Sequence, residues 1–177
     1  MTDELLDIVN DDDEVIGQAM RSSVHEHGLQ HRGVHVFLFT REGKLLIQKR
    51  SAERAQYPSV WDCSVSEHVK AGESYYEAAR RGMLEELGVK DGEVQPLVRF
   101  RLEYGPNDNE ISMFFEGAVD PDMVEFDLSE IEQIEYHTLA RLRSFMEDGE
   151  RPFSYWFEQL FHWALEEPSK LQVLETY

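Results

Sequence analysis

The sequence predicts an α+β fold, an α/β/α sandwich in which a mixed β-sheet lies between helices. Short apolar runs separated by turn residues indicate strands, several of them in hairpin order. One long helix is expected in the middle of the chain, and two more are expected after residue 138. A length of 177 residues suits one domain with a sizeable core, so we expect a single domain over residues 1–177.

The first half of the chain predicts two strand pairs. The apolar residues Leu6, Ile8 and Val9 precede the aspartate triplet 11–13, which is expected to be a solvated turn, and Val15 and Ile16 follow it. A polar segment follows to residue 32. Residues 35–39 and 45–48 are then predicted to form a hairpin around a glycine turn.

The central helix has both of its ends marked. Ser74 and Glu77 form a capping-box pattern at its start, and Gly88 suits the left-handed residue that ends a helix. Apolar residues recur at three- and four-residue steps and predict a stripe that packs on the core, comprising Tyr76, Ala79, Met83 and Leu87. Glu85 and Glu86 are expected to point away from that stripe.

The second half of the chain predicts more strands and the last two helices. A strand at 61–65 should lead into a loop at 66–68, and further strands are expected at 97–104, 110–116 and 131–136. The predicted helices span 139–146 and 155–165. The tail to residue 177 is expected to be loose.

Composition and charge narrow the class of protein. A formal net charge of −19 opposes binding to nucleic acid or to an anionic membrane surface, and no apolar run reaches the ~18 residues of a membrane span. The acidic N-terminus does not resemble a signal peptide. Cys63 is the single cysteine, so no internal disulfide can form, and a cytoplasmic location is expected. The sequence does not indicate an oligomeric state.

The chain has five lysines beside 36 acidic residues, a balance that predicts a halophilic origin. High salt screens the repulsion between like surface charges and so stabilises such a fold. We expect the native circular dichroism to be lost below molar salt. Full stability in dilute buffer would contradict this prediction.

Apart from the capping residue Glu77, three carboxylates lie on or beside the central helix, Glu73, Glu85 and Glu86. Oxygen ligands of this kind favour Mg²⁺ or Mn²⁺, which in turn prefer diphosphate oxygens. The alternative is a solvated acidic helix with an ion pair between Arg81 and Glu85. Lys49, Arg50 and Arg54 likewise suit either a phosphate cradle or a charged strand end.

The central stretch resembles the Nudix signature, Gly-x5-Glu-x7-Arg-Glu-U-x-Glu-Glu-x-Gly-U with U aliphatic. The matching positions are Glu73, Arg81, Met83, Glu85, Glu86, Gly88 and Val89. Two positions depart from it, because the opening glycine is Glu67 and the glutamate after the arginine is Gly82. The resemblance implies the Nudix sandwich and a metal-bound diphosphate, with one usual metal ligand missing.

Almost the full chain is also similar to type I isopentenyl-diphosphate isomerase. That resemblance implies a second metal site made of histidines and carboxylates, with ligands His25, His31, His68, Asp108 and Glu110. His27 could replace His25, because the alignment needs a deletion there. Mixed nitrogen and oxygen ligands suit Zn²⁺, Mn²⁺ or Fe²⁺.

The same resemblance implies diphosphate-binding roles for Arg21, Arg50 and Arg54, and a Mg²⁺-holding role for Glu86. Trp156 matches the tryptophan that stabilises a carbocation in that family by cation–π attraction. Plain core packing is the alternative for this side chain.

One departure weighs against isomerase chemistry. Ser66 stands where the isomerases have a catalytic cysteine, and a hydroxyl is a much weaker acid than a thiol. Cys63 is expected to lie on another strand face, and the family's tyrosine falls on Leu102, with Tyr104 close by.

We therefore expect a metal-dependent hydrolase of a small nucleoside or prenyl diphosphate. Glu86, Glu85, Glu110 and Ser66 are the candidate catalytic residues. An isomerase that works without the usual cysteine is the second expectation, and a non-catalytic binding module, which Gly82 favours, is the third.

Overall fold

The computed structural model describes residues 3–54 and 56–177 and has the α+β architecture that the sequence predicts. The strands are β1 (Leu5–Val9), β2 (Val15–Met20), β3 (His31–Phe39), β4 (Leu45–Arg50), β5 (Trp61–Asp62), β6 (Val65–His68), β7 (Val94–Gly105), β8 (Asp108–Ala118), β9 (Ile131–His137) and β10 (Gln172–Thr176). The helices are α1 (Arg21–His27), α2 (Tyr75–Leu87), the 3-10 turn η1 (Pro121–Met123), α3 (Leu139–Asp148) and α4 (Tyr155–Ala164).

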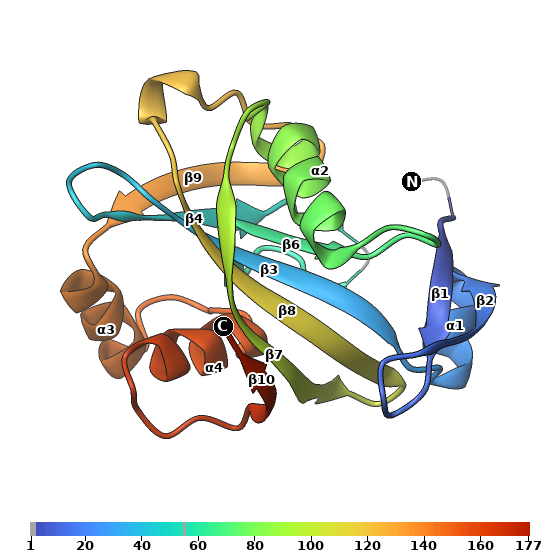
Figure 1. Ribbon diagram of the computed structural model, residues 1–177. Helices are drawn as coiled ribbons and strands as arrows, with labels where there is room; N and C mark the ends of the chain where they lie inside the picture. Colours follow the sequence, from blue (N-terminus) through green and yellow to red (C-terminus); the bar gives the residue numbers. More distant parts are fainter. Residues whose placement is uncertain (1–2, 55) are drawn as a thin grey trace.

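The main sheet is mixed and has the strand order β10-β7-β8-β3-β4-β5, with β6 paired to β3 and β9 paired to β4. The central pair β3–β8 is parallel, whereas the other pairs are antiparallel. Helix α2 covers one face of the sheet, and α3 and α4 cover the other (Figure 1). Alternate residues of β3 enter the two cores, Val34 and Val36 toward α2 and Phe37 toward α4.

Helix α2 begins and ends as predicted. Ser74 and Glu77 form the reciprocal capping box, and Gly88 has the left-handed conformation with φ 69°. Ala79, Met83 and Leu87 are fully buried, as expected. Tyr76 is not part of this stripe, because it is 37% exposed and its hydroxyl donates to Glu93.

The predicted solvated turn at residues 11–13 is only partly exposed. The Asp13 side chain is 6% exposed and accepts hydrogen bonds from Arg32, Arg99 and Tyr75. This carboxylate ties the turn of the β1–β2 hairpin to β3, β7 and α2. The hairpin leads directly into α1, whose first residue is Arg21. Helix α1 then lies at the His31 end of β3, where the candidate site is located.

Two other expectations were wrong. Residues 66–68 are not a loop, because they form most of β6 and pair with β3. The C-terminal tail is not loose, since β10 pairs with β7 along Val98–Arg101 and forms the edge of the sheet (Figure 1). In both cases short strands became ordered through distant partners.

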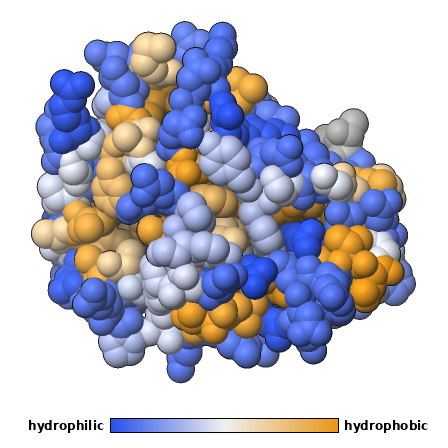
Figure 2. Space-filling view, in the orientation of Figure 1, coloured by the Kyte–Doolittle hydropathy of each residue, from blue (hydrophilic) through white to orange (hydrophobic). Residues whose placement is uncertain are grey.

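The surface is largely polar on the face that Figure 2 shows. The visible face is mostly hydrophilic, with an apolar area over β1 and β2 (Figure 2), where Val15 and Ile16 are at least half exposed. None of the helices in the described part of the chain is both long and apolar enough to cross a membrane.

Candidate active site

The register of β3 with its neighbours brings the predicted histidines and carboxylates together. In the antiparallel β3–β6 pair, Gly33 lies opposite His68. In the parallel β3–β8 pair, His31 lies opposite Glu110. Helix α1 adds His25, so residues of α1, β3, β6 and β8 meet at one end of β3.

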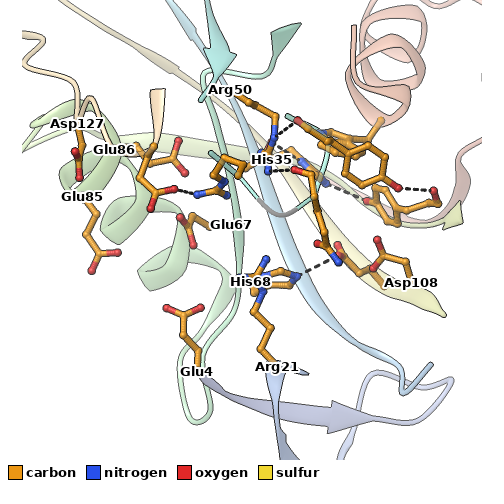
Figure 3. A pocket seen from close by; sticks show the side chains of 18 residues that line it. Glu4, Arg21, His35, Arg50, Glu67, His68, Glu85, Glu86, Asp108 and Asp127 are labelled. Atoms are coloured by element: carbon orange, nitrogen blue, oxygen red, sulfur yellow. Dashed lines mark hydrogen bonds and ion pairs between the residues drawn. The ribbon is translucent and has the colours of Figure 1, made fainter. Parts of the chain in front are cut away.

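A pocket of about 370 Å³ opens beside this cluster (Figure 3). Ten of the predicted site residues line it, namely Arg21, Arg50, Arg54, Ser66, His68, Glu85, Glu86, Asp108, Glu110 and Trp156. Several lining residues were not predicted from the sequence, including Glu4, His35, Tyr57, Glu67, Asp127 and Glu130. The pocket therefore has an acidic wall at α2 and a wall at β3 and β6 that bears His35 and His68.

The three predicted histidines form a compact cluster. Ligand atoms of His25, His31 and His68 all lie within 4.8 Å of one another, and the same holds for His31, Asp108 and Glu110. Glu110 Oε1 lies 3.4 Å from His31 Nε2 and 3.7 Å from His68 Nε2. His27 is turned away and bonds the Ser23 carbonyl, so it does not replace His25.

The cluster has the properties of a metal-binding site. Within residues 3–54 and 56–177, buried atoms without a hydrogen-bond partner include Nε2 of His25, Nε2 of His31 and Oδ1 of Asp108. Unpaired buried polar atoms are unfavourable, and a cation would satisfy all three. Burial lowers the pKa of His68 and of His25, so both imidazoles are neutral at neutral pH, the form that binds metals. The residues thus fit a transition metal.

Gly33 makes room for the Glu110 carboxylate. A Cβ atom at this position would lie 2.2 Å from Glu110 Oε2. We expect Gly33→Ala to displace Glu110 and to weaken Zn²⁺ binding at least tenfold in titration calorimetry. Gly17→Ala is the matched control, because its Cβ would meet nothing within 4 Å. Equal Zn²⁺ affinity of the two variants would contradict this role of Gly33.

Arg81 organises the carboxylates at the start of α2. Its guanidinium donates to Glu73 Oε1 at 2.9 Å, to Glu67 at 3.2 Å and to Glu85 at 3.2 Å. Glu73 also accepts the Lys70 backbone N–H and is absent from the pocket lining. In this structure Glu73 therefore has the geometry of a residue that positions Arg81, and direct metal binding by Glu73 stays a prediction.

Glu86 faces the pocket from the buried side of α2, although the sequence pattern placed it away from the core. It is 4% exposed and accepts a hydrogen bond of 2.5 Å from Gln48 Nε2. Burial and the neighbouring Glu67 carboxyl raise the pKa of Glu86 well above its usual value. Two carboxyl groups held this close, one of them buried, favour a cation between them.

A family model of the NUDIX domain matches residues 29–157, which is more than half of the chain. The chain belongs to the NUDIX family. The predicted family membership and the predicted sandwich fold are both confirmed.

Individual relatives include hydrolases and isomerases. The chain is 39% identical over 129 residues to an uncharacterised Nudix hydrolase of Streptomyces coelicolor, covering 70% of this chain and 71% of that protein. It is 29% identical over 164 residues to isopentenyl-diphosphate Delta-isomerase 2 of Photorhabdus laumondii, covering 90% and 92%. The crystal structure of DR0079 from Deinococcus radiodurans matches with a TM-score of 0.75 and 30% identity, covering 90% and 98%.

The two departures from the Nudix signature lie against each other in space. A Cβ atom on Gly82 would be 2.9 Å from Glu67 Cγ and 2.5 Å from Val65 Cγ1. Glu67 therefore fills the space that a side chain at position 82 would need, and its carboxylate reaches the same pocket wall as Glu85 and Glu86. Sequence comparison alone shows a lost glutamate, whereas the structure shows a carboxylate supplied from β6.

Two of the arginines that are predicted to bind diphosphate, Arg50 and Arg54, already make contacts within the protein. Arg50 is buried and donates to Asp62 and to the backbone carbonyls of Gln56 and Tyr57. Arg54 is paired with Glu130. Both nevertheless line the pocket, and Arg21 lines it from the other side.

Asp62 anchors the far wall of this Nudix pocket. Its Oδ1 atom accepts hydrogen bonds from the Trp156 indole at 2.6 Å and from Ser154 at 2.9 Å. The indole is thereby fixed, 6% exposed, with Tyr57 packed edge-on at 4.8 Å. Cys63 is fully buried and burial raises the pKa of its thiol, so it cannot serve in place of Ser66.

Proposed function

We propose that this Nudix protein is a divalent-metal-dependent hydrolase of a small diphosphate. The observation that carries the proposal is the wall of Glu67, Glu85 and Glu86, which shares a pocket of about 370 Å³ with Arg21, Arg50 and Arg54. Mg²⁺ or Mn²⁺ bound there would neutralise diphosphate oxygens and activate water. The raised pKa of Glu86 supports this site, because a bound cation would offset the cost of burying the ionised carboxylate.

The protein's own groups supply the rest of the chemistry. Arg21 and Arg54 line the same pocket as the acids and would balance the charge that develops on the leaving phosphate. Arg81 holds the acids in place through its contacts with Glu67 and Glu85. Glu67 in this scheme takes the role of the glutamate that the signature lacks at Gly82.

The proposal is tested by phosphate release. Nucleoside and prenyl diphosphates are incubated with Mg²⁺ or Mn²⁺, and a parallel series contains EDTA. Metal-dependent release from at least one class supports the proposal. Tight metal-dependent binding without turnover at any pH would identify a binding module instead.

Isomerase activity is the second candidate, and the histidine cluster is the observation that favours it. His25, His31, His68, Asp108 and Glu110 lie close enough together that they could hold Zn²⁺, Mn²⁺ or Fe²⁺, and Trp156 lies in the pocket wall. Conversion of isopentenyl to dimethylallyl diphosphate, abolished by Glu110→Gln, would establish it. Gain of this conversion in Ser66→Cys would show that only the proton donor is missing.

A further inference from the structure

A chain of hydrogen bonds runs from the histidine cluster to Ser66 through buried side chains. Ser112 Oγ lies 3.0 Å from Glu110 Oε2, and the Tyr104 hydroxyl lies 3.0 Å from Ser112 Oγ. The Tyr104 hydroxyl is also 3.0 Å from His35 Nε2, while His35 Nδ1 is 3.0 Å from Ser66 Oγ. His35 and Ser66 meet because they are register partners in the β3–β6 pair.

The bond at the Glu110 end sets the direction of every other bond in this chain. Ser112 Oγ donates to Glu110 Oε2, so its single proton is used and its oxygen must accept from Tyr104. The Tyr104 proton is then committed, so its oxygen accepts from the N–H on His35 Nε2. A carboxylate bound to a metal ion also accepts, so occupancy of the histidine site does not reverse the order.

The outcome at the other end concerns Ser66. His35 carries its proton on Nε2, which leaves Nδ1 as an acceptor for the Ser66 hydroxyl proton. The other nearby acceptor, Asp62 Oδ1, lies 3.3 Å from Ser66 Oγ and already receives the Trp156 and Ser154 donors. Both acceptors lie on the protein side of Ser66, so its hydroxyl proton points away from the pocket. The lone pairs of Ser66 Oγ then face the pocket and can accept a hydrogen bond.

We infer that His35 is a positioning residue that makes Ser66 a hydrogen-bond acceptor toward the pocket, where it receives an O–H of the attacking water. This role rests on the hydrolase function proposed above. His35 is 4% exposed and packed between Phe100 and Trp156, so its ring cannot turn freely. A Ser66 oriented in this way does not offer its proton to a substrate, which separates this pocket from one built around a proton-donating thiol.

The tautomer of His35 is measured directly by ¹⁵N NMR of the imidazole, with the signals assigned by their loss in His35→Asn. We expect the Nε2–H tautomer in the metal-free protein, irrespective of activity. Tyr104→Phe should populate the Nδ1–H tautomer, because it removes the acceptor for Nε2–H. Tyr57→Phe is the control, since its hydroxyl bonds the Tyr104 backbone carbonyl and lies outside the chain. An Nδ1–H tautomer in the unmodified protein would overturn the inference.

Steady-state kinetics test the proposed role of Ser66 as an acceptor for the attacking water. Ser66→Ala should lower kcat about tenfold with little change in KM, the loss of one hydrogen bond to the reacting water. His35→Asn keeps an acceptor near the Nδ1 position and should retain most of kcat, whereas His35→Gln places its amide near Nε2 and should lose as much as Ser66→Ala. An unchanged kcat in Ser66→Ala would overturn the role of Ser66. The NMR result is independent of whether diphosphate hydrolysis is found.

Discussion

Replacing Glu86 by glutamine is expected to lower metal-dependent phosphate release at least ~100-fold and to stabilise the metal-free protein. The carboxylate is almost fully buried beside Glu67, and the glutamine oxygen can still accept from Gln48. The substitution therefore removes the charge and keeps the shape. Glu93→Gln is the matched control, because Glu93 bonds the exposed Tyr76 at some distance from the pocket.

The stabilisation should depend on pH in one direction. Burial raises the pKa of Glu86 above the 4.5 usual for glutamate, so above pH 4.5 the folded protein binds more protons than the unfolded chain. The contribution of Glu86 to stability is thus fully present below pH 4.5 and is lost as the pH rises through the folded pKa. In EDTA, Glu86→Gln should have the higher Tm at pH 8, and the difference should shrink toward pH 4.

Mn²⁺ should reverse the order of the two Tm values, so that the wild type becomes more stable than Glu86→Gln. The wild type gains stability from metal binding by mass action, whereas Glu86→Gln gains little. Thermal scans with and without Mn²⁺ measure both effects. Phosphate release in Glu86→Gln within a few-fold of wild type, or a lower Tm in EDTA at pH 8, would show that the buried carboxylate has another role.

Glu67 is the subject of the second large prediction. Glu67→Gln should weaken Mn²⁺ binding to the α2 wall at least tenfold, as measured by calorimetry on protein whose histidine site is already filled with Zn²⁺. Glu93→Gln again controls for the loss of one negative charge. Unchanged affinity in Glu67→Gln would mean that this side chain only supports Arg81.

Moving the carboxylate back to α2 gives a stricter version of the same prediction. Val65 Cγ1 would lie 2.5 Å from a Cβ at position 82, so all proteins carry Val65→Ala. In that background, Glu67→Gly should lose Mn²⁺ affinity, and Glu67→Gly with Gly82→Glu should recover it. Failure of a folded double variant to recover Mn²⁺ affinity would contradict an exchange between these two positions.

Local signals predicted the elements well, and non-local pairing explains the differences. The capping box and Gly88 define α2 without help from the rest of the chain. The β10 strand and the β6 strand depend on partners about 70 and 30 residues away, which no local pattern contains. Asp13 likewise became buried because three side chains from other elements converge on it.

The site shows the same division. The resemblance gave the histidines, and the structure brings them together with Asp108 and Glu110. His35 and Glu67 were missed because their importance comes from cross-strand register and from close approach of α2 to β6. The glycine at 82 was interpreted as a loss, since a sequence does not show which side chain fills the space beside a glycine.

The location of bound metal tests the central claim most directly. Crystals grown with Mn²⁺ and a non-hydrolysable diphosphate are measured for anomalous scattering at the manganese edge. We predict one peak among Glu67, Glu85 and Glu86 that contacts the diphosphate, and a second among the histidines. A diphosphate bound without any peak at those three carboxylates would contradict the account.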